Sequence, residues 1–300
     1  MPELDVGDGN VIHWEEHGNP DGKPALVVHG GPGSGSNHSW LKPFDLDRYR
    51  VVLFDQRGCG RSRPHAADPA TDMRHNTTWH LVADMERLRE HLRVPGWLLY
   101  GGSWGSTLLL AYAQQHPHRV TEIVIAAVTM TRRSDIDWLY RGVGRYFPAQ
   151  WERFRALVPG DDVVGGYARL MESPSAEVRE KAAAEWCRWE DAVLSGETDS
   201  PVYGARLPRA RLGLVRICTH YFAHAAWLEE GVLLHHAPRL AGIPAVLIHG
   251  RLDLGGPLAV AWELHQAWPG SELIVVEGAG HLATAATREH VAQALTRFAP

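Results

Sequence analysis

Short runs of consecutive apolar residues recur along the chain and predict buried strands. Strands that are buried on both faces show such continuous runs, which are typical of parallel sheets covered by helices on both sides. Residues 11–16 alternate only weakly and predict an edge strand instead. The continuous runs occupy residues 24–28, 50–54, 98–100, 122–128, 245–250 and 273–276.

Helical periodicity appears between these runs. Residues 76–78, Asn-Thr-Thr, form a capping signal for a helix that extends to about residue 92. Its expected inner face carries Trp79, Val82, Met85, Leu88 and Leu92. A second apolar helix follows residue 103, and a helix from about 287 to 298 closes the chain. Strands that alternate with helices favour an α/β fold with a mostly parallel sheet and right-handed crossovers.

The alternation stops in the middle of the chain. Residues 131–241 show no convincing buried strand, only short amphipathic stretches separated by prolines. Aromatic residues suited to a pocket wall gather there, namely Trp138, Tyr140, Trp186, Trp189 and Tyr203. We therefore predict a helical cap over 131–241, inserted between two parts of one α/β core at 1–130 and 242–300.

A Gly-x-Ser-x-Gly motif stands at residues 101–105, after an apolar run and before an apolar helical segment. In a strand–turn–helix setting, the central serine is held at a strained backbone angle that pushes its hydroxyl clear of the sheet. The hydroxyl then lies beside the positive end of the following helix. An ordinary glycine- and serine-rich turn is the alternative, but the flanking elements favour Ser103 as a nucleophile.

A serine hydroxyl needs a base within hydrogen-bond reach. Two later strand ends supply partners: Asp253 follows the run at 245–250, and His281 follows the run at 273–276. Functional groups in open α/β sheets gather beyond the carboxyl ends of the strands. The order Ser, Asp, His predicts a catalytic triad. The alternative is that Asp253 caps the next helix and His281 is a polar turn residue.

Acyl transfer also needs donors for the oxyanion of the tetrahedral intermediate. The residue after the nucleophile supplies one backbone N–H, which predicts Trp104. The second is expected in the loop at 29–33, His-Gly-Gly-Pro-Gly, where Gly31 is favoured and Gly30 is its rival.

Composition narrows the classes of protein. The 300 residues are 45% hydrophobic and 22% charged, with a formal net charge of −5, so a nucleic-acid partner is not expected. No apolar stretch approaches the roughly 20 residues of a membrane helix. The N-terminal sequence lacks a signal-peptide pattern, which favours the cytoplasm. Three scattered cysteines favour neither a disulfide framework nor a zinc site.

No metal or other cofactor is expected. His220 and His224 stand four residues apart and could face a metal ion, but the sequence shows no third ligand, which favours structural roles. Nothing near Cys218 pairs it with a base, and Ser103 already fills the role of nucleophile, so Cys218 is not expected to act as one.

Three motifs together resemble the proline iminopeptidases, a family of the α/β-hydrolase fold. They are His-Gly-Gly-Pro-Gly at 29–33, Asp-Gln-Arg-Gly-Cys-Gly-Arg-Ser at 55–62 and Gly-Gly-Ser-Trp-Gly-Ser-Thr at 101–107. The resemblance continues through the expected cap and through residues 250–253 and 279–281. It implies a serine hydrolase, with an inserted cap, that releases N-terminal proline or another small residue from a small peptide or amide. A monomer or small homo-oligomer is expected.

The resemblance also implies how substrate is held. Glu190 matches a cap carboxylate that binds the free amine, and a cation entering an apolar cap needs such a counter-charge. Cys218 stands where the family has a second carboxylate, and the segment 282–285, Leu-Ala-Thr-Ala, also departs from the family pattern. The remaining residues expected at the substrate are Trp186, Trp189, Tyr221 and Phe222.

Two departures keep other functions open. One alternative is an amidase or esterase that acts on a non-peptide small molecule with altered amine recognition. Another is a binding protein without turnover, which the complete set of catalytic positions disfavours.

Overall fold

The computed structural model describes residues 2–195 and 202–300. Its strands are β1 (Glu3–Gly7), β2 (Asn10–Gly18), β3 (Lys23–Val28), β4 (Tyr49–Phe54), β5 (Trp97–Ser103), β6 (Val120–Val128), β7 (Ala245–Gly250) and β8 (Ser271–Val276). Its α-helices are α1 (Thr78–His91), α2 (Trp104–Gln115), α3 (Arg133–Tyr140), α4 (Pro148–Arg155), α5 (Val163–Met171), α6 (Ala176–Leu194), α7 (Pro208–Ala223), α8 (Val232–His235), α9 (Leu258–Ala267) and α10 (Ala285–Phe298).

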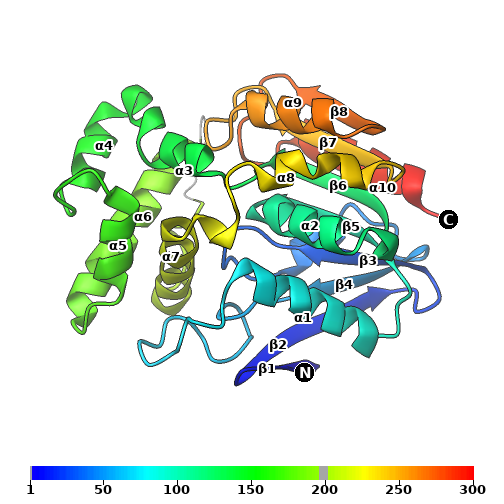
Figure 1. Cartoon of the computed structure of the whole chain (residues 1–300), viewed down its shortest axis with the longest axis horizontal. Helices are drawn as coiled ribbons and strands as arrows, with labels where there is room; N and C mark the ends of the chain where they lie inside the picture. The colour runs from blue at the N-terminus through cyan, green and yellow to red at the C-terminus, as the bar shows by residue number, and fades with distance from the viewer. Residues whose placement is uncertain (1, 196–201) are drawn as a thin grey trace.

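One eight-stranded sheet organises the body of the molecule, in the order β1-β2-β4-β3-β5-β6-β7-β8 (Figure 1). β2 runs antiparallel to both β1 and β4, and every other pairing is parallel. The structure thus confirms the predicted α/β class and the mostly parallel sheet. The predicted edge strand at 11–16 lies inside β2, and the prediction that it is an edge was wrong. β1 covers it, because a tight turn at Asp8–Gly9 folds the N-terminal residues back onto β2.

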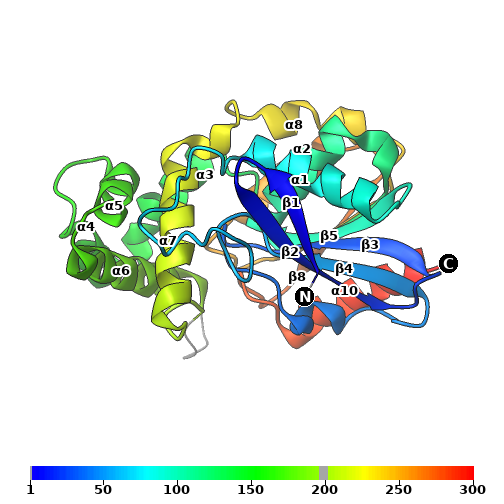
Figure 2. The same ribbon diagram turned by 90° about the horizontal axis from the view of Figure 1, so that it is seen from below.

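Alternate residues of each buried strand face two separate cores. In β3, Leu26 and Val28 face the core that α1, α2 and α9 cover, whereas Ala25 and Val27 face the core that α10 covers. Continuous apolar runs are therefore required in the central strands, because each strand supplies both layers. Figure 2 shows α1 and α2 on one side of the sheet and α10 on the other.

The inner face of α1 differs from the prediction in two residues, since Leu81 belongs to it and Trp79 does not. Leu81, Val82, Met85 and Leu88 are buried, but the Trp79 side chain is 43% exposed. Trp79 lies off the stripe that Leu81, Met85 and Leu88 form at helical spacing. Its indole N–H instead donates to the carbonyl oxygen of Trp227 at 3.1 Å.

Helices α3 to α7 form a separate group beside the sheet (Figures 1 and 2), with an aromatic-rich core of their own. α7 joins the two parts: Leu214 and Cys218 pack into the cap, whereas Ile217 and Tyr221 pack into the body. Further on, α8 packs on α2 and α9 of the body. We therefore propose that the cap extends from residue 131 to about 224, shorter than the 131–241 expected from the sequence.

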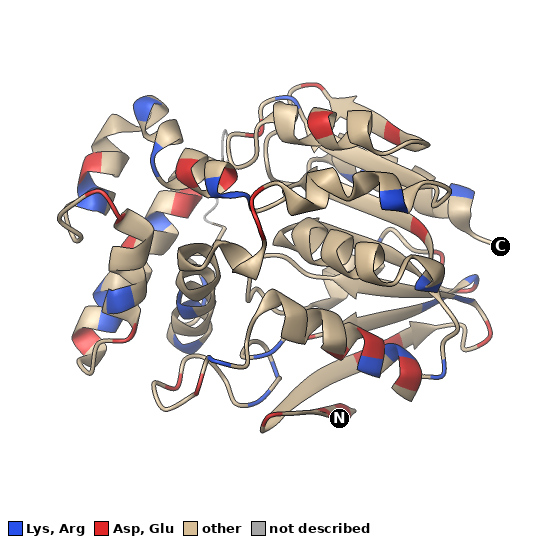
Figure 3. Ribbon diagram, in the orientation of Figure 1, with Lys and Arg blue, Asp and Glu red and all other residues tan. Residues whose placement is uncertain are grey.

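Charged residues of both signs are interspersed over the cap and the body (Figure 3). One pair is fully buried: the Arg57 guanidinium donates to both carboxylate oxygens of Asp84, at 2.6 and 2.7 Å. Arg57 also donates to backbone carbonyl oxygens of Val6 and His75. The pair thus fixes the loop after β4 against α1 and the N-terminal strand.

Asp84→Ala is expected to lower the free energy of unfolding by about 3–5 kcal/mol, because it leaves a buried guanidinium with only the longer contact, at 3.4 Å, to the more exposed Asp8 carboxylate. Urea denaturation of the two proteins measures the difference. Asp72→Ala is the control, since the Asp72–Arg74 pair is solvent-exposed and little change is expected. Equal stabilities for the Asp84 variant and the parent would contradict this role for Asp84.

Candidate active site

Ser103 lies at the junction of β5 and α2 with a φ of 55° and a ψ of −132°. Few L-residues adopt positive φ, so the surrounding packing must hold this strained conformation. A Cβ atom at Gly101 would lie 2.7 Å from the Val28 carbonyl oxygen, and one at Gly105 would lie 2.2 Å from the same atom. The two glycines of the motif therefore allow the turn to press against the end of β3.

Two hydroxyl groups hold the turn in place from behind. The Ser103 carbonyl oxygen accepts hydrogen bonds from Ser106 Oγ at 2.7 Å and from Thr129 Oγ1 at 2.8 Å. Ser106 Oγ also accepts from the Thr129 N–H. The sequence analysis did not identify Thr129, because its position after β6 becomes adjacent to Ser103 only through strand pairing.

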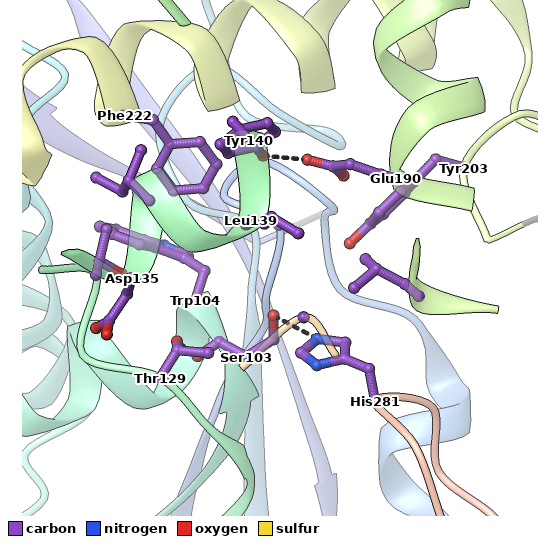
Figure 4. A pocket seen from close by; sticks show the side chains of 15 residues that line it. Ser103, Trp104, Thr129, Asp135, Leu139, Tyr140, Glu190, Tyr203, Phe222 and His281 are labelled. Carbon is purple, nitrogen blue, oxygen red and sulfur yellow. Dashed lines mark hydrogen bonds between the residues drawn. The ribbon is translucent and has the colours of Figure 1, made fainter. Parts of the chain in front are cut away.

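The three predicted triad residues come together at the carboxyl ends of β5, β7 and β8. His281 Nε2 lies 3.0 Å from Ser103 Oγ (Figure 4). His281 Nδ1 lies 3.0 and 2.9 Å from the two oxygens of Asp253. With the proton on Nδ1, the imidazole donates to the carboxylate and accepts from the serine hydroxyl. This arrangement is able to take the serine proton as attack begins.

The charged forms of His281 and Asp253 stabilise each other. Burial acts to lower the pKa of His281, but the adjacent Asp253 carboxylate outweighs it and raises that pKa above the ordinary value. Burial acts in the opposite direction on Asp253, and the imidazole and its hydrogen bonds hold the pKa of that carboxyl below its ordinary value. Asp253 thus stays ionised and stabilises the imidazolium formed during the reaction.

His249, which the sequence analysis did not identify as a site residue, supports Asp253 from the end of β7. Its Nδ1 accepts from the Val128 N–H at 3.0 Å, and its Nε2 donates to the Gly256 carbonyl oxygen at 2.7 Å. The Gly256 N–H in turn donates to Asp253 Oδ1 at 2.9 Å. Burial lowers the pKa of His249. A histidine in an otherwise apolar strand was the available sequence signal.

Gln56 bridges the loop at 29–33 and Trp104, the two segments that carry the predicted oxyanion donors. Gln56 donates to the His29 carbonyl oxygen at 2.9 Å and accepts from the Trp104 indole N–H at 3.0 Å. Trp104 is the first residue of α2, where a backbone N–H has no intrahelical acceptor. Gly31 lines the pocket at Ser103 with a φ of +116°. Gln56 therefore ties the loop at 29–33 to the nucleophile turn.

A small pocket of about 50 Å³ lies between Ser103 and the cap. Figure 4 shows Leu139, Phe222 and the other labelled side chains around it. Its walls are mostly apolar, through Ile136, Leu139, Leu194 and Phe222. Glu190, from α6, lines it too. The pocket therefore suits a small apolar group that carries a positive charge.

Glu190 is only 3% exposed and is held by two cap residues. Its Oε1 accepts from the Tyr140 hydroxyl and from the Trp186 indole N–H, the latter at 2.9 Å. Among residues 2–195 and 202–300, none donates to Oε2. Burial raises the pKa of Glu190 to about 7, although both hydrogen bonds act to lower it. Oε2 thus remains available for a cationic ligand.

The residues predicted to bind substrate take different places. Glu190 and Phe222 line the small pocket. Trp186, Trp189 and Tyr221 are fully buried behind its surface, where their polar atoms bond to Glu190, Leu139 and Asn76 respectively. Cys218 is also buried and donates to the Pro32 carbonyl oxygen at 3.2 Å. Direct substrate contact by these four residues stays a prediction, and the structure gives them positions that support the pocket wall.

Tyr140 and Tyr203 line the same pocket, and the sequence analysis placed them only among the general cap aromatics. The Tyr140 hydroxyl acts on the site through its bond to Glu190, a contact that no motif encodes.

The two histidines considered as metal ligands are engaged with the backbone. His220 Nε2 donates to the Asn76 carbonyl oxygen at 3.1 Å, and His224 Nδ1 donates to the His220 carbonyl oxygen at 2.8 Å. Burial lowers the pKa of His220 to about 4. The absence of a metal or cofactor stays a prediction. Within the described part of the chain, no helix is both long and apolar enough to cross a membrane.

The fold and the site define a serine hydrolase. Residues 23–284 match the family described as the alpha/beta hydrolase fold. A probable proline iminopeptidase from Streptomyces coelicolor is 46% identical over 99% of this chain and 94% of its own length. A proline iminopeptidase from Xylella fastidiosa is 44% identical over 93% of this chain and 90% of its own. The chain belongs to the proline iminopeptidase family of the α/β-hydrolase fold, as the motifs had indicated.

Solved structures resemble the chain at the level of the fold. A bromoperoxidase from Bacillus anthracis aligns over 99% of this chain and 98% of its own, with a TM-score of 0.67 and 20% identity. A likeness this remote shows the shared architecture alone, since one fold carries many chemistries.

Proposed function

We propose that the chain is an aminopeptidase that releases N-terminal proline, or another small residue, from peptides through an acyl-enzyme. One observation carries the proposal: the hydrogen-bonded series Ser103–His281–Asp253 opens onto a small apolar pocket that also contains the carboxylate of Glu190. The family relatives support proline as the released residue.

In the first half of the reaction, Ser103 Oγ attacks the carbonyl carbon of the N-terminal residue while its proton passes to His281 Nε2. The backbone N–H groups of Trp104 and Gly31 stabilise the negative charge that develops on the carbonyl oxygen. His281 then gives the proton to the leaving nitrogen, and the peptide bond breaks.

In the second half, a water molecule attacks the acyl-enzyme. His281 takes a proton from that water and returns one to Ser103 as the acyl group leaves. Asp253 keeps the imidazole in the same orientation through both halves and stabilises its charged form.

Glu190 supplies the selectivity for a free N-terminus. The protonated amine of the substrate pairs with the Glu190 carboxylate, and the apolar walls of the small pocket contact the proline ring. Because an unpaired charge in this pocket is costly, a cation and the ionised Glu190 stabilise each other when both are present.

A substrate panel tests the proposal. Prolyl, alanyl and leucyl arylamides, the N-acetylated prolyl arylamide and short-chain acyl esters are compared by kcat/KM. Highest activity on the prolyl arylamide, with loss on N-acetylation, supports the aminopeptidase. Activity confined to the esters would favour the alternative of a small-molecule esterase or amidase, for which the replacement of a family carboxylate by Cys218 is the supporting observation.

The pH profile should depend on the substrate. His281 must be neutral to act as base, and its pKa is raised above the ordinary 6.5, so activity on a neutral ester should fall with slope one below a midpoint above 6.5. Substrates with a free amine also need Glu190 ionised, and its pKa is about 7 in the free enzyme. Their kcat/KM should therefore fall with a slope approaching two.

Measurements of kcat/KM from pH 5 to 9 for a prolyl arylamide and an ester distinguish these profiles. Glu190→Gln should return the arylamide profile to slope one. Identical acid limbs for both substrates would contradict amine binding by Glu190.

The cellular location, the oligomeric state and the partners of the chain remain proposals. We propose a cytoplasmic location and a monomeric or small homo-oligomeric state, and the net charge of −5 supports the absence of a nucleic-acid partner.

A further inference from the structure

A second and much larger cavity, of about 1150 Å³, meets the small pocket at the catalytic serine. Ser103, His281, Gly31 and Tyr203 line both spaces. The attacked carbonyl carbon is bonded to the acyl group on one side and to the leaving nitrogen on the other. Since the small pocket holds the acyl group, the large cavity is the space into which the leaving peptide extends.

The charges of the two spaces are opposite. In the small pocket, Asp135 is paired with Arg132, which leaves Glu190 as the carboxylate without a cationic partner among the described residues. Besides His281, the charged residues that line the large cavity are Lys42, Arg206, Arg288 and Glu289. The acyl side is therefore acidic, whereas the leaving-group side carries an excess of cations.

Arg206 is the cation best placed to contact a ligand near the scissile bond. Its Nη1 donates to the Ser34 carbonyl oxygen at 2.9 Å, and its guanidinium carbon lies 5.4 Å from the centre of the Tyr203 ring. Ser34 follows Gly31 by three residues, a stretch of chain that spans at most about 11 Å. The guanidinium is thus anchored beside the loop that carries the predicted oxyanion donor.

The charge of Arg206 is not balanced by any carboxylate in the part of the chain that the structure describes. No carboxylate of residues 2–195 or 202–300 lies within ion-pair distance of it, and its buried Nε has no hydrogen-bond partner. Holding a partly buried guanidinium without a counter-ion is unfavourable. A guanidinium also matches the geometry of a carboxylate better than any other side chain does.

We propose that Arg206 binds the C-terminal carboxylate of short peptide substrates, so that the preferred substrates are di- and tripeptides with a free C-terminus. The inference rests on the proposed aminopeptidase function and adds its leaving-group specificity. A short peptide is a zwitterion whose ammonium group meets Glu190 and whose carboxylate lies one or two residues beyond the scissile bond. In a long peptide, the carboxylate lies too far along the chain to reach Arg206.

Peptides that differ only at the C-terminus test the proposal. For the parent enzyme, kcat/KM is measured on Pro-Gly and Pro-Gly-Gly as free acids and as C-terminal amides, with a prolyl arylamide as a third leaving group. At least one of the two free acids should exceed its amide by roughly ten- to hundredfold, the range of a charge-assisted hydrogen bond. Arg206→Gln should remove this difference, and Arg206→Lys, which keeps the charge, should retain part of it.

Arg209→Gln is the matched control, because Arg209 is exposed on the same segment and does not line the cavity. It should keep the preference of the parent for the free acid. Equal rates on acids and amides for the parent would overturn the proposal. So would an Arg206→Gln variant that loses the same factor on acid, amide and arylamide, since that result would assign Arg206 to support of the Ser34 loop.

The outcome also separates this inference from the aminopeptidase function itself. If the arylamide and both peptide forms are hydrolysed at similar rates, only the role of Arg206 fails. If esters are hydrolysed and no prolyl substrate is, the proposed aminopeptidase function is wrong. The proposed binding of a peptide carboxylate by Arg206 is then wrong as well.

Discussion

Ser103→Ala is expected to lower kcat/KM for a prolyl arylamide by at least about 10⁴-fold while leaving the fold intact. The substitution removes the one oxygen that attacks the substrate, and triad members act as a unit, so the partners cannot compensate. His281→Ala should lose a comparable factor. The fold should survive, because Ser103 Oγ is hydrogen-bonded only to His281 Nε2 among the described residues and the strained turn is held through the Ser103 carbonyl oxygen.

Covalent labelling provides the control for this prediction. An active-site phosphonofluoridate should modify the parent at a single serine and leave Ser103→Ala unmodified. Ser106→Ala is the matched variant, since the Ser106 hydroxyl lies one helical turn further and bonds to the backbone of Ser103 and Thr129 instead of the imidazole. It should still be labelled. Activity of Ser103→Ala within tenfold of the parent, or labelling of that variant, would exclude Ser103 as the nucleophile.

The sheet and the nucleophile turn were predictable because local sequence determines them. Continuous apolar runs mark strands whose alternate residues supply two core layers. Gly101 and Gly105 are required because the nucleophile turn presses against the backbone of Val28. The N-terminal strand β1 was not predicted, since only Leu4 and Val6 alternate there and pairing with β2 stabilises it. The exposed position of Trp79 likewise depends on a neighbour, Trp227.

In the candidate site too, the sequence predicted some residues, whereas the roles of others depend on the folded structure. Ser103, Asp253 and His281 were found because each follows a strand, and strand ends converge in this fold. The residues that support them, such as Thr129, Gln56 and His249, have roles that depend on which segments become adjacent. Trp186 and Trp189 on α6 and Tyr221 on α7 are aromatic, and composition alone cannot separate a pocket surface from the layer behind it.

Glu190→Gln is expected to lower kcat/KM for substrates with a free N-terminal amine by two to three orders of magnitude. Loss of one partner from a buried charge pair costs about 3–5 kcal/mol, because the other charge is left uncompensated. The amide keeps the shape of the side chain and an oxygen that can accept from Tyr140 and Trp186. N-acetylated prolyl arylamides and esters carry no such charge and should be hydrolysed at rates near those of the parent.

Glu180→Gln is the matched control on the same helix, where the side chain is exposed. It should leave both substrate classes unchanged. An equal loss for amines and esters in Glu190→Gln would point to damage of the cap and would contradict selective pairing with the amine. Steady-state kinetics on the prolyl arylamide, its N-acetyl form and a short ester are measured for the parent, Glu190→Gln and Glu180→Gln.

Cys218→Glu extends the same argument to the position where the family has its second carboxylate. In the parent background, the new carboxyl group would lie near Glu190, and two like charges in one buried space disfavour each other, so one should take up a proton. The expected gain on prolyl arylamides is therefore small. In the Glu190→Gln background, the new carboxylate has no second carboxylate beside it and should restore part of the lost selectivity for a free amine.

Cys218 is fully buried, so the melting temperature of each variant is measured alongside its kinetics. A folded double variant that remains as inactive on amines as Glu190→Gln would show that position 218 does not face the substrate amine, in keeping with its contact to the Pro32 carbonyl oxygen.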